Sequence, residues 1–257
     1  VLLVDVATFG CAVATLLFAP PVAEKARTAS GDAWRDARIG WAYVLRRPGL
    51  LGMLLVFAVA NLAMAFANVL FIPLLLPLAG EAGMGIVLSV AGVGMILGSV
   101  AVVARGLPQP RIVVMLACLL VGGAAMTLSG VFPDARLVAL FAFLLMAVVP
   151  AVNTAVYGVL QTRVPDRLQG RVQSLRRMLM QAAAPLAYVA AGPLADRVFE
   201  PAMRSGGWLA ERIGATRGTC DCGGAAVLCM LVCLLVIGGA LLGWLSPAIR
   251  RVEQRGR

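Results

Sequence analysis

The residues of this sequence that could do chemistry are isolated polar side chains within long apolar stretches. Asn61 and Asn68 lie seven residues apart, and Asn153, Tyr157 and Gln161 follow one another at intervals of four. Both spacings place side chains on one face of an α-helix. Amides and a phenol on such a face can hydrogen-bond a solute or hold a neighbouring helix, and the spacing alone leaves both roles open.

A proline and a second polar stripe add to this pattern. Pro150 lies just before Asn153, and irregular backbone at membrane depth is tolerated where it borders protein or a cavity, which favours a solute pathway. Gln181 belongs to a stripe with Gln173 and Tyr188 at near-helical spacing. A polar stripe in hydrocarbon should face protein or a water-filled cavity. Helix packing is the alternative role of these glutamines.

One acid lies near the start of the chain. Asp5 precedes a charge-free window and is expected about one turn inside the outer end of the first helix. Ionisable residues in membranes are candidates for function, so Asp5 is a candidate for a group that carries a coupling proton. At that depth it can equally be an interfacial residue in contact with water.

The composition argues against catalysis and metal binding. The sequence has no histidine, and no pair of acids is placed on one helix face at membrane depth. Membrane-embedded lipid transferases and proteases need such carboxylates, a histidine or a metal. Six cysteines without any histidine also argue against a structural zinc site. We therefore predict no enzyme activity, no metal and no cofactor.

The elements that must position the polar residues are membrane helices. Of 257 residues, 61% are hydrophobic and 13% are charged, about half the charged share of a soluble protein. The mean hydropathy is +0.94. The net charge of +10 would suggest nucleic acid in a soluble domain, but here the basic residues fall in short loops, so no nucleic-acid partner is expected. The partners of the helix surfaces are the lipids of the bilayer.

Charge-free windows set the predicted spans. They cover residues 6–23, 48–80, 82–104, 112–133, 137–162, 178–195 and 222–249. Each is roughly long enough to cross about 30 Å of hydrocarbon as a helix. We predict an all-α integral membrane protein with seven transmembrane helices. Gly94 and Gly98 form a GxxxG pair that predicts close helix packing, and the fourth and seventh spans have few polar residues and are expected to be scaffold.

The basic residues predict the orientation of the chain in the cell membrane. Seventeen of the 22 Lys and Arg residues lie in alternate connections, namely 24–47, 105–111, 161–177 and the tail from Arg250. Because cytoplasmic loops carry an excess of basic residues, these connections are predicted to be inside. Val1 is then outside and Arg257 is cytoplasmic. The arginine-rich connection supplies candidates for a cytoplasmic gate or loop: Arg163, Arg167, Gly170, Arg171, Arg176 and Arg177.

The longest predicted cytoplasmic connection, residues 23–48, contains an amphipathic pattern. Trp34, Arg38, Trp41 and Leu45 lie about one turn apart. This spacing predicts a helix that lies along the inner headgroups and leads into the next span. A partner-binding helix is the alternative.

Several segments resemble one transporter family. The run PDRLQGRVQSLRRM and the later APLAYVAAGPLADRVFEP resemble the tenth-to-eleventh helix region of major facilitator superfamily exporters, in the branch that includes macrolide-efflux and enterobactin-exporter-like proteins. The opening VLLVDVATFGCAVATLLFAPP is similar to the sixth helix of that branch, and WRDARIGWAYVLRRPGLLGMLLVFAVANL is similar to its central linker and seventh helix. The loop GSVAVVARGLPQPR lacks the aspartate that the family often has there, so an inner-gate charge network at this loop is not supported.

The resemblance implies a division of the chain and a function. Residues 1–22 would be the last helix of an N-terminal half, 23–48 the cytoplasmic linker, 49–249 the C-terminal six-helix half and 250–257 a basic tail. The chain would then be helices 6–12 of a twelve-helix secondary transporter whose other helices are missing. It implies an exporter of bulky apolar or amphipathic small molecules, of the drug or siderophore class, that works by alternating access with a proton as the candidate coupling ion. A non-transporting membrane anchor or assembly subunit is the alternative, with a membrane-embedded enzyme as a third.

Overall fold

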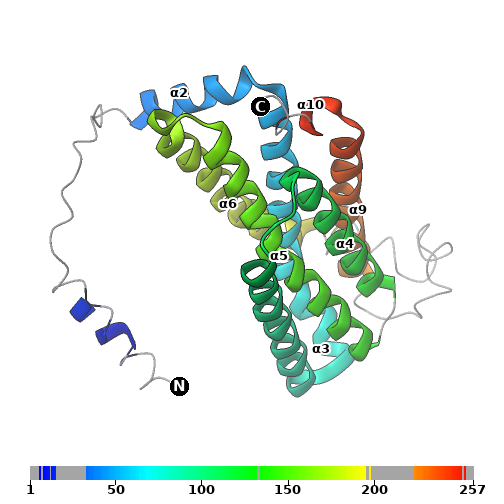
Figure 1. Ribbon diagram of the computed structural model, residues 1–257. Helices are drawn as coiled ribbons and strands as arrows, with labels where there is room; N and C mark the ends of the chain where they lie inside the picture. The colour runs from blue at the N-terminus through cyan, green and yellow to red at the C-terminus, as the bar shows by residue number, and fades with distance from the viewer. Residues whose placement is uncertain are drawn as a thin grey trace. The chain divides into compact units, whose positions relative to one another are not determined.

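The computed structural model of the chain is helical throughout the part that it describes (Figure 1), namely residues 6, 8–11, 13–15, 33–131, 134–194, 197, 223–250 and 252. The helices are α2 (Ala33–Leu45), α3 (Pro48–Arg105), α4 (Arg111–Val131), α5 (Ala135–Arg163), α6 (Asp166–Leu194), α9 (Gly223–Leu245) and α10 (Pro247–Arg250). The all-helical class predicted from the sequence is therefore confirmed.

The chain divides into two compact units, residues 1–36 and residues 37–257. In the first unit, the described residues between 6 and 15 are helical, and Val6 and Phe9 are exposed. The hydroxyl of Thr15 donates to the carbonyl of Cys11, 3.0 Å away, as expected one helical turn back. Asp5, the candidate proton-coupling group, lies outside the described residues.

Four of the described helices are long and apolar enough to cross a membrane. They are α3, α5, most of α4 (Arg111–Gly130) and most of α9 (Val227–Leu245). In hydrocarbon every backbone polar group must be bonded within the protein, so uncharged runs of this length form helices. The membrane class is thus supported, while the count of seven spans stays a prediction.

α3 covers two of the predicted spans. Its 58 residues are interrupted at Gly80, whose φ of +66° and ψ of −178° are not helical. Leu75 and Val87, on either side of this break, belong to one buried cluster with Val138. Twelve residues of straight helix would separate Leu75 and Val87 by about 18 Å, so the chain must turn back at Gly80 (Figure 1). The break lies where the two charge-free windows meet.

α6 is not among the four helices, although its second half, from Met178, was predicted to be a span. That half contains Gln181, Tyr188, Pro185 and Pro193, which lower its hydropathy. α6 also begins at Asp166, within the arginine-rich segment, so the segment predicted as a loop is largely helical. The predicted loop is therefore wrong from Asp166 onward, where α6 has already begun. That α6 crosses the bilayer stays a prediction.

The helices of the second unit meet through apolar side chains and glycines. The largest buried cluster includes Met53 and Leu54 of α3, Met115 of α4 and Val156 of α5. α4, predicted to be scaffold that faces lipid, buries Met115 completely and exposes Val121 by 48%. It therefore has one face in the core and one outside.

The GxxxG pair has the role predicted for it. A methyl group built on Gly94 would overlap the carbonyl oxygen of Phe143, and one built on Gly98 would overlap that of Ala147. Both carbonyls belong to α5. The absence of side chains at Gly94 and Gly98 thus lets α3 and α5 approach backbone to backbone.

Polar side chains in α3 to α6 bond mainly to their own helix. The side-chain nitrogens of Asn61, Asn68 and Asn153 donate to carbonyl oxygens four residues back, over 2.8 to 3.1 Å. Serine and threonine hydroxyls likewise donate to carbonyl oxygens three or four residues earlier in the same helix. These residues are Ser89, Ser99, Thr127, Ser129, Thr162 and Ser174. Each helix therefore satisfies these donors without a neighbour.

Candidate functional site

The charged centre of the described bundle is Arg176 of α6. Only 5% of its surface is exposed. Its guanidinium carbon lies 3.7 Å from the centroid of the Tyr157 ring on α5 and 5.8 Å from that of Phe57 on α3. Its Nε donates to the side-chain oxygen of Gln173, 3.2 Å away on the same helix. Arg176 thus joins three helices at one level of the bundle.

Burial of this guanidinium is costly and only partly offset. Nη1 of Arg176 is buried and has no hydrogen-bond partner among the residues that the structure describes. Taking a charge out of water costs several kcal/mol unless it is paired, whereas a desolvated cation–π contact returns about 2 kcal/mol. Such a charge within a membrane bundle is by default a candidate for function. Arg176 was predicted as a gate or loop residue, and its burial by two aromatic rings was not predicted.

Two of the predicted amides line a common pocket. Asn61 of α3 and Asn153 of α5 border a cavity of about 120 Å³ whose other walls include Met64, Cys118 and Cys233. Each amide nitrogen spends one N–H on its own helix, so the second N–H and the amide oxygen are the groups that can bind a ligand. The pocket is otherwise apolar, and it includes residues of α4 and α9, the two predicted scaffold helices.

The remaining predicted pathway residues are exposed and lie apart from this pocket. Asn68 bonds to the carbonyl of Met64 and is exposed. Gln161 and Gln181 are also exposed, and Tyr157, which stacks on Arg176, is 42% exposed. The structure therefore joins Asn61 to Asn153 and Tyr157 to Arg176, and it brings Asn68, Gln161 and Gln181 into neither pair.

The other gate candidates surround the connection between α5 and α6. Gln169 donates to the carbonyl of Gln161, 3.1 Å away, and to Asp166, 3.3 Å away, which holds the short connection closed. Arg167, Gly170 and Arg177 are exposed. Arg163 and Arg171 are half-buried, and the backbone of Arg171 lies 3.1 Å from a methyl built on Gly40 of α2.

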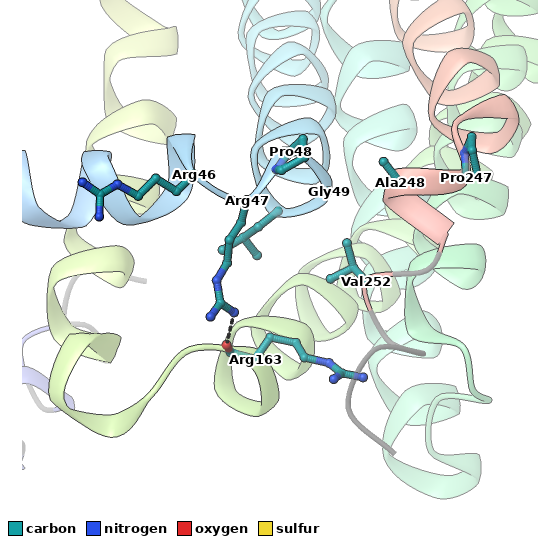
Figure 2. A pocket seen from close by; sticks show the side chains of 9 residues that line it. Arg46, Arg47, Pro48, Gly49, Arg163, Pro247, Ala248 and Val252 are labelled. Atoms are coloured by element: carbon teal, nitrogen blue, oxygen red, sulfur yellow. Dashed lines mark hydrogen bonds between the residues drawn. The ribbon is translucent and has the colours of Figure 1, made fainter.

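A larger basic pocket lies where α3 begins and α5 ends (Figure 2). Arg47 stacks on Tyr43 with 4.5 Å between guanidinium carbon and ring centroid, and its Nη1 donates to the carbonyl of Arg163 over 3.4 Å. The Tyr43 hydroxyl donates to the same carbonyl over 3.2 Å. These bonds attach the end of α5 to the junction of α2 and α3. Arg163 was predicted as a gate or loop residue, whereas Arg46 and Arg47 were predicted only to lie in a basic cytoplasmic connection.

Within the described ranges, no group of three His, Cys, Asp or Glu side chains is arranged to hold a metal ion. The polar groups of both pairs are amides, a phenol and a guanidinium, which suit hydrogen bonding and stacking.

Comparison with known proteins identifies the family. The family model described as Major Facilitator Superfamily matches residues 2–188. No curated protein and no solved structure gives a significant match. The match covers most of the 257 residues, including α3, α4, α5 and most of α6. The chain therefore belongs to the Major Facilitator Superfamily, whose members are membrane transporters.

Proposed function

We propose that this chain is the C-terminal part of a secondary active exporter that moves bulky apolar or amphipathic small molecules by alternating access. Residues 1–257 would correspond to helices 6–12 of twelve, in the macrolide-efflux and enterobactin-exporter-like branch. In this proposal the N-terminal half of such a transporter would supply the opposite wall of the pathway. The protein would lie in the plasma membrane, with residue 1 outside and the C-terminus in the cytoplasm.

The observation that carries this proposal is the contact of Arg176 with Tyr157 and Phe57. α3, α5 and α6 carry the predicted pathway residues, and they meet at this one charge. Charged side chains buried among membrane helices commonly mark substrate or ion pathways, whereas in a scaffold an incompletely paired buried charge costs several kcal/mol. The contact therefore favours a transporter over a membrane anchor.

The small pocket supports the proposed class of substrate. Its walls are apolar apart from Asn61 and Asn153, and binding sites for small molecules combine apolar walls with a few oriented polar groups. An amphipathic compound with one or two hydrogen-bonding groups would suit these two amides. In this proposal a proton is the coupling ion, with Asp5 as its candidate carrier.

Export of fluorescent dyes from cells that make the complete transporter tests the proposal. The dyes should be amphipathic and should include cationic, neutral and anionic compounds. Asn153→Leu and Gln181→Leu should each raise the dye retained in the cells without lowering the amount of protein in the membrane. Thr154→Val is a matched control, because Thr154 does not border the pocket and belongs to none of the predicted polar stripes. Unchanged export in both leucine variants would argue against the pathway, and no export of any dye by the unmodified protein would argue against the exporter.

A further inference from the structure

A cavity of the second unit lies at the junction of α2 and α3, and none of the predicted pathway residues is among its lining residues. Its volume is about 560 Å³. It is bordered by Arg46, Arg47 and Arg163, by the first turn of α3, and by residues 247, 248 and 252 near α10. The proposed function does not use this cavity.

The cavity is strongly basic. Three arginines, Arg46, Arg47 and Arg163, are among its lining residues, and none of the described residues that line it is an acid. Figure 2 shows Arg47 reaching from the start of α3 toward the end of α5, while Arg46 extends along α2. Stacking on Tyr43 holds the guanidinium of Arg47 in place, which lowers the entropy lost when a ligand binds. Guanidinium groups bind phosphate oxygens through paired, charge-assisted hydrogen bonds.

The start of α3 adds to the positive potential. Arg47 is the residue before the helix and its side chain does not cap it, and Pro48 is the first helical residue. The first backbone bond of the helix runs from Leu51 to the carbonyl of Arg47. The amide N–H groups of Gly49 and Leu50 precede that bond, so they belong to the set that helix starts offer to anions.

The rest of the cavity wall is apolar. Leu50, Pro247, Ala248 and Val252 complete the lining, and α10 packs so closely on Gly49 that a methyl there would overlap the carbonyl oxygen of Ala248. Arginines beside an apolar wall suit a ligand in which a phosphate group is attached to an apolar group. Basic pockets between membrane helices are known to bind anionic lipid headgroups.

We propose that this cavity binds a phosphate group, with Arg46, Arg47 and the start of α3 as its main ligands. The phosphate can belong to an anionic lipid headgroup or to a soluble phosphate compound. Either ligand would fasten the junction of α2 and α3 to the ends of α5 and α10. The site is independent of the transported substrate.

Lipid retention by the complete protein, purified in a neutral detergent, tests the site. Native mass spectrometry would count molecules of phosphatidylglycerol, or of uncharged phosphatidylcholine, that stay bound. A parallel arm would titrate inorganic phosphate and follow the melting temperature. Since each basic residue contributes about a fivefold change in affinity, Arg47→Gln should weaken binding roughly fivefold and Arg46→Gln with Arg47→Gln roughly 25-fold.

Matched variants separate the site from general charge. Arg105→Gln removes an exposed arginine from the other end of α3 and should leave binding within about twofold of the unmodified protein. Arg47→Lys keeps the charge and should keep part of the affinity. Because Arg46 and Arg47 are exposed, their glutamine variants are expected to fold, which a single elution peak and an unchanged melting temperature without ligand would verify.

The outcomes divide clearly. Preference for phosphatidylglycerol that the Arg46 and Arg47 variants abolish supports a lipid headgroup as the ligand. Stabilisation by inorganic phosphate, lost in the same variants and without lipid preference, supports a soluble phosphate. Equal binding in the unmodified protein, the double variant and Arg105→Gln, in both arms, would overturn the proposal.

Discussion

The guanidinium carbon of Arg176 on α6 lies over the ring of Tyr157 on α5, 3.7 Å from the ring centroid. By helical rise, Arg176 lies about 15 Å from the start of α6. The ring therefore takes the place of part of the solvation shell that the charge has lost. Tyr157 and Arg176 should depend on each other energetically.

Tyr157→Leu should lower the free energy of unfolding by about 1–2 kcal/mol, because the buried charge of Arg176 would lose its stacking partner. Tyr188→Leu is a suitable control, since Tyr188 is 68% exposed. Thermal unfolding in detergent would measure both variants. Combining Tyr157→Leu with Arg176→Gln should cost less than the sum of the single changes. Additive losses would show that the contact carries no coupling energy.

Gly98→Ala should destabilise the protein by about 1–3 kcal/mol, because the new methyl would overlap the carbonyl oxygen of Ala147 and push α3 from α5. Gly92→Ala, six residues earlier, meets nothing within 4 Å. It should be neutral or stabilising by up to about 1 kcal/mol, as expected for a glycine replaced in a helix. Melting temperatures of the two variants that agree would contradict the close packing.

Gly80→Ala should cost about 1–3 kcal/mol for a different reason. No atom lies within 4 Å of a methyl built on Gly80, but its φ of +66° disfavours any residue with a side chain. Gly85→Ala has the same open surroundings within a regular helix and should not destabilise. Denaturation of both variants under one condition would show the difference. If Gly80→Ala were as stable as Gly85→Ala, the turn at Gly80 would be wrong.

Cysteine labelling should reveal the orientation of the second unit. In a cysteine-free background, Arg167→Cys should react with a membrane-impermeant maleimide only after the cells are opened, because basic connections are expected inside. Glu81→Cys, next to the break in α3, should react in intact cells. Arg167 and Glu81 are both exposed, so each is accessible to the reagent. The reverse pattern would invert the proposed topology.

The helices could be predicted because hydrocarbon leaves the backbone few choices. An uncharged run of about twenty residues must bond its own N–H and C=O groups, so the windows at 48–80, 82–104, 112–133 and 137–162 map closely onto α3, α4 and α5. The spacing of Gly94 and Gly98 predicted close helix packing, but it did not identify α5 as the helix that packs there. Residue spacing defines a face of a helix, and the partner of that face depends on the fold.

The candidate site was only partly predictable for the same reason. Asn61 and Asn153 were chosen as members of separate stripes, and only the packing of α3 on α5 places them on one pocket. Arg176 was taken for part of a basic loop, since charge is normally kept out of the apolar interior. The aromatic rings that receive it come from Phe57 and Tyr157, which lie 119 and 19 residues earlier. No local sequence pattern could have predicted that Arg176 would contact both rings.

The inward bonding of the asparagines, serines and threonines has a mechanical consequence. In α3 to α6 these side chains bond to the carbonyls of their own helices, and the contacts between helices are largely apolar or glycine contacts. Dispersion contacts are weak one by one and can be exchanged as surfaces slide, whereas a crosslinking hydrogen bond must break before its partners separate. Separating these helices would therefore break few hydrogen bonds, whereas the bonds from Tyr43 and Arg47 to the carbonyl of Arg163 crosslink the junction of α2 and α3 to the end of α5.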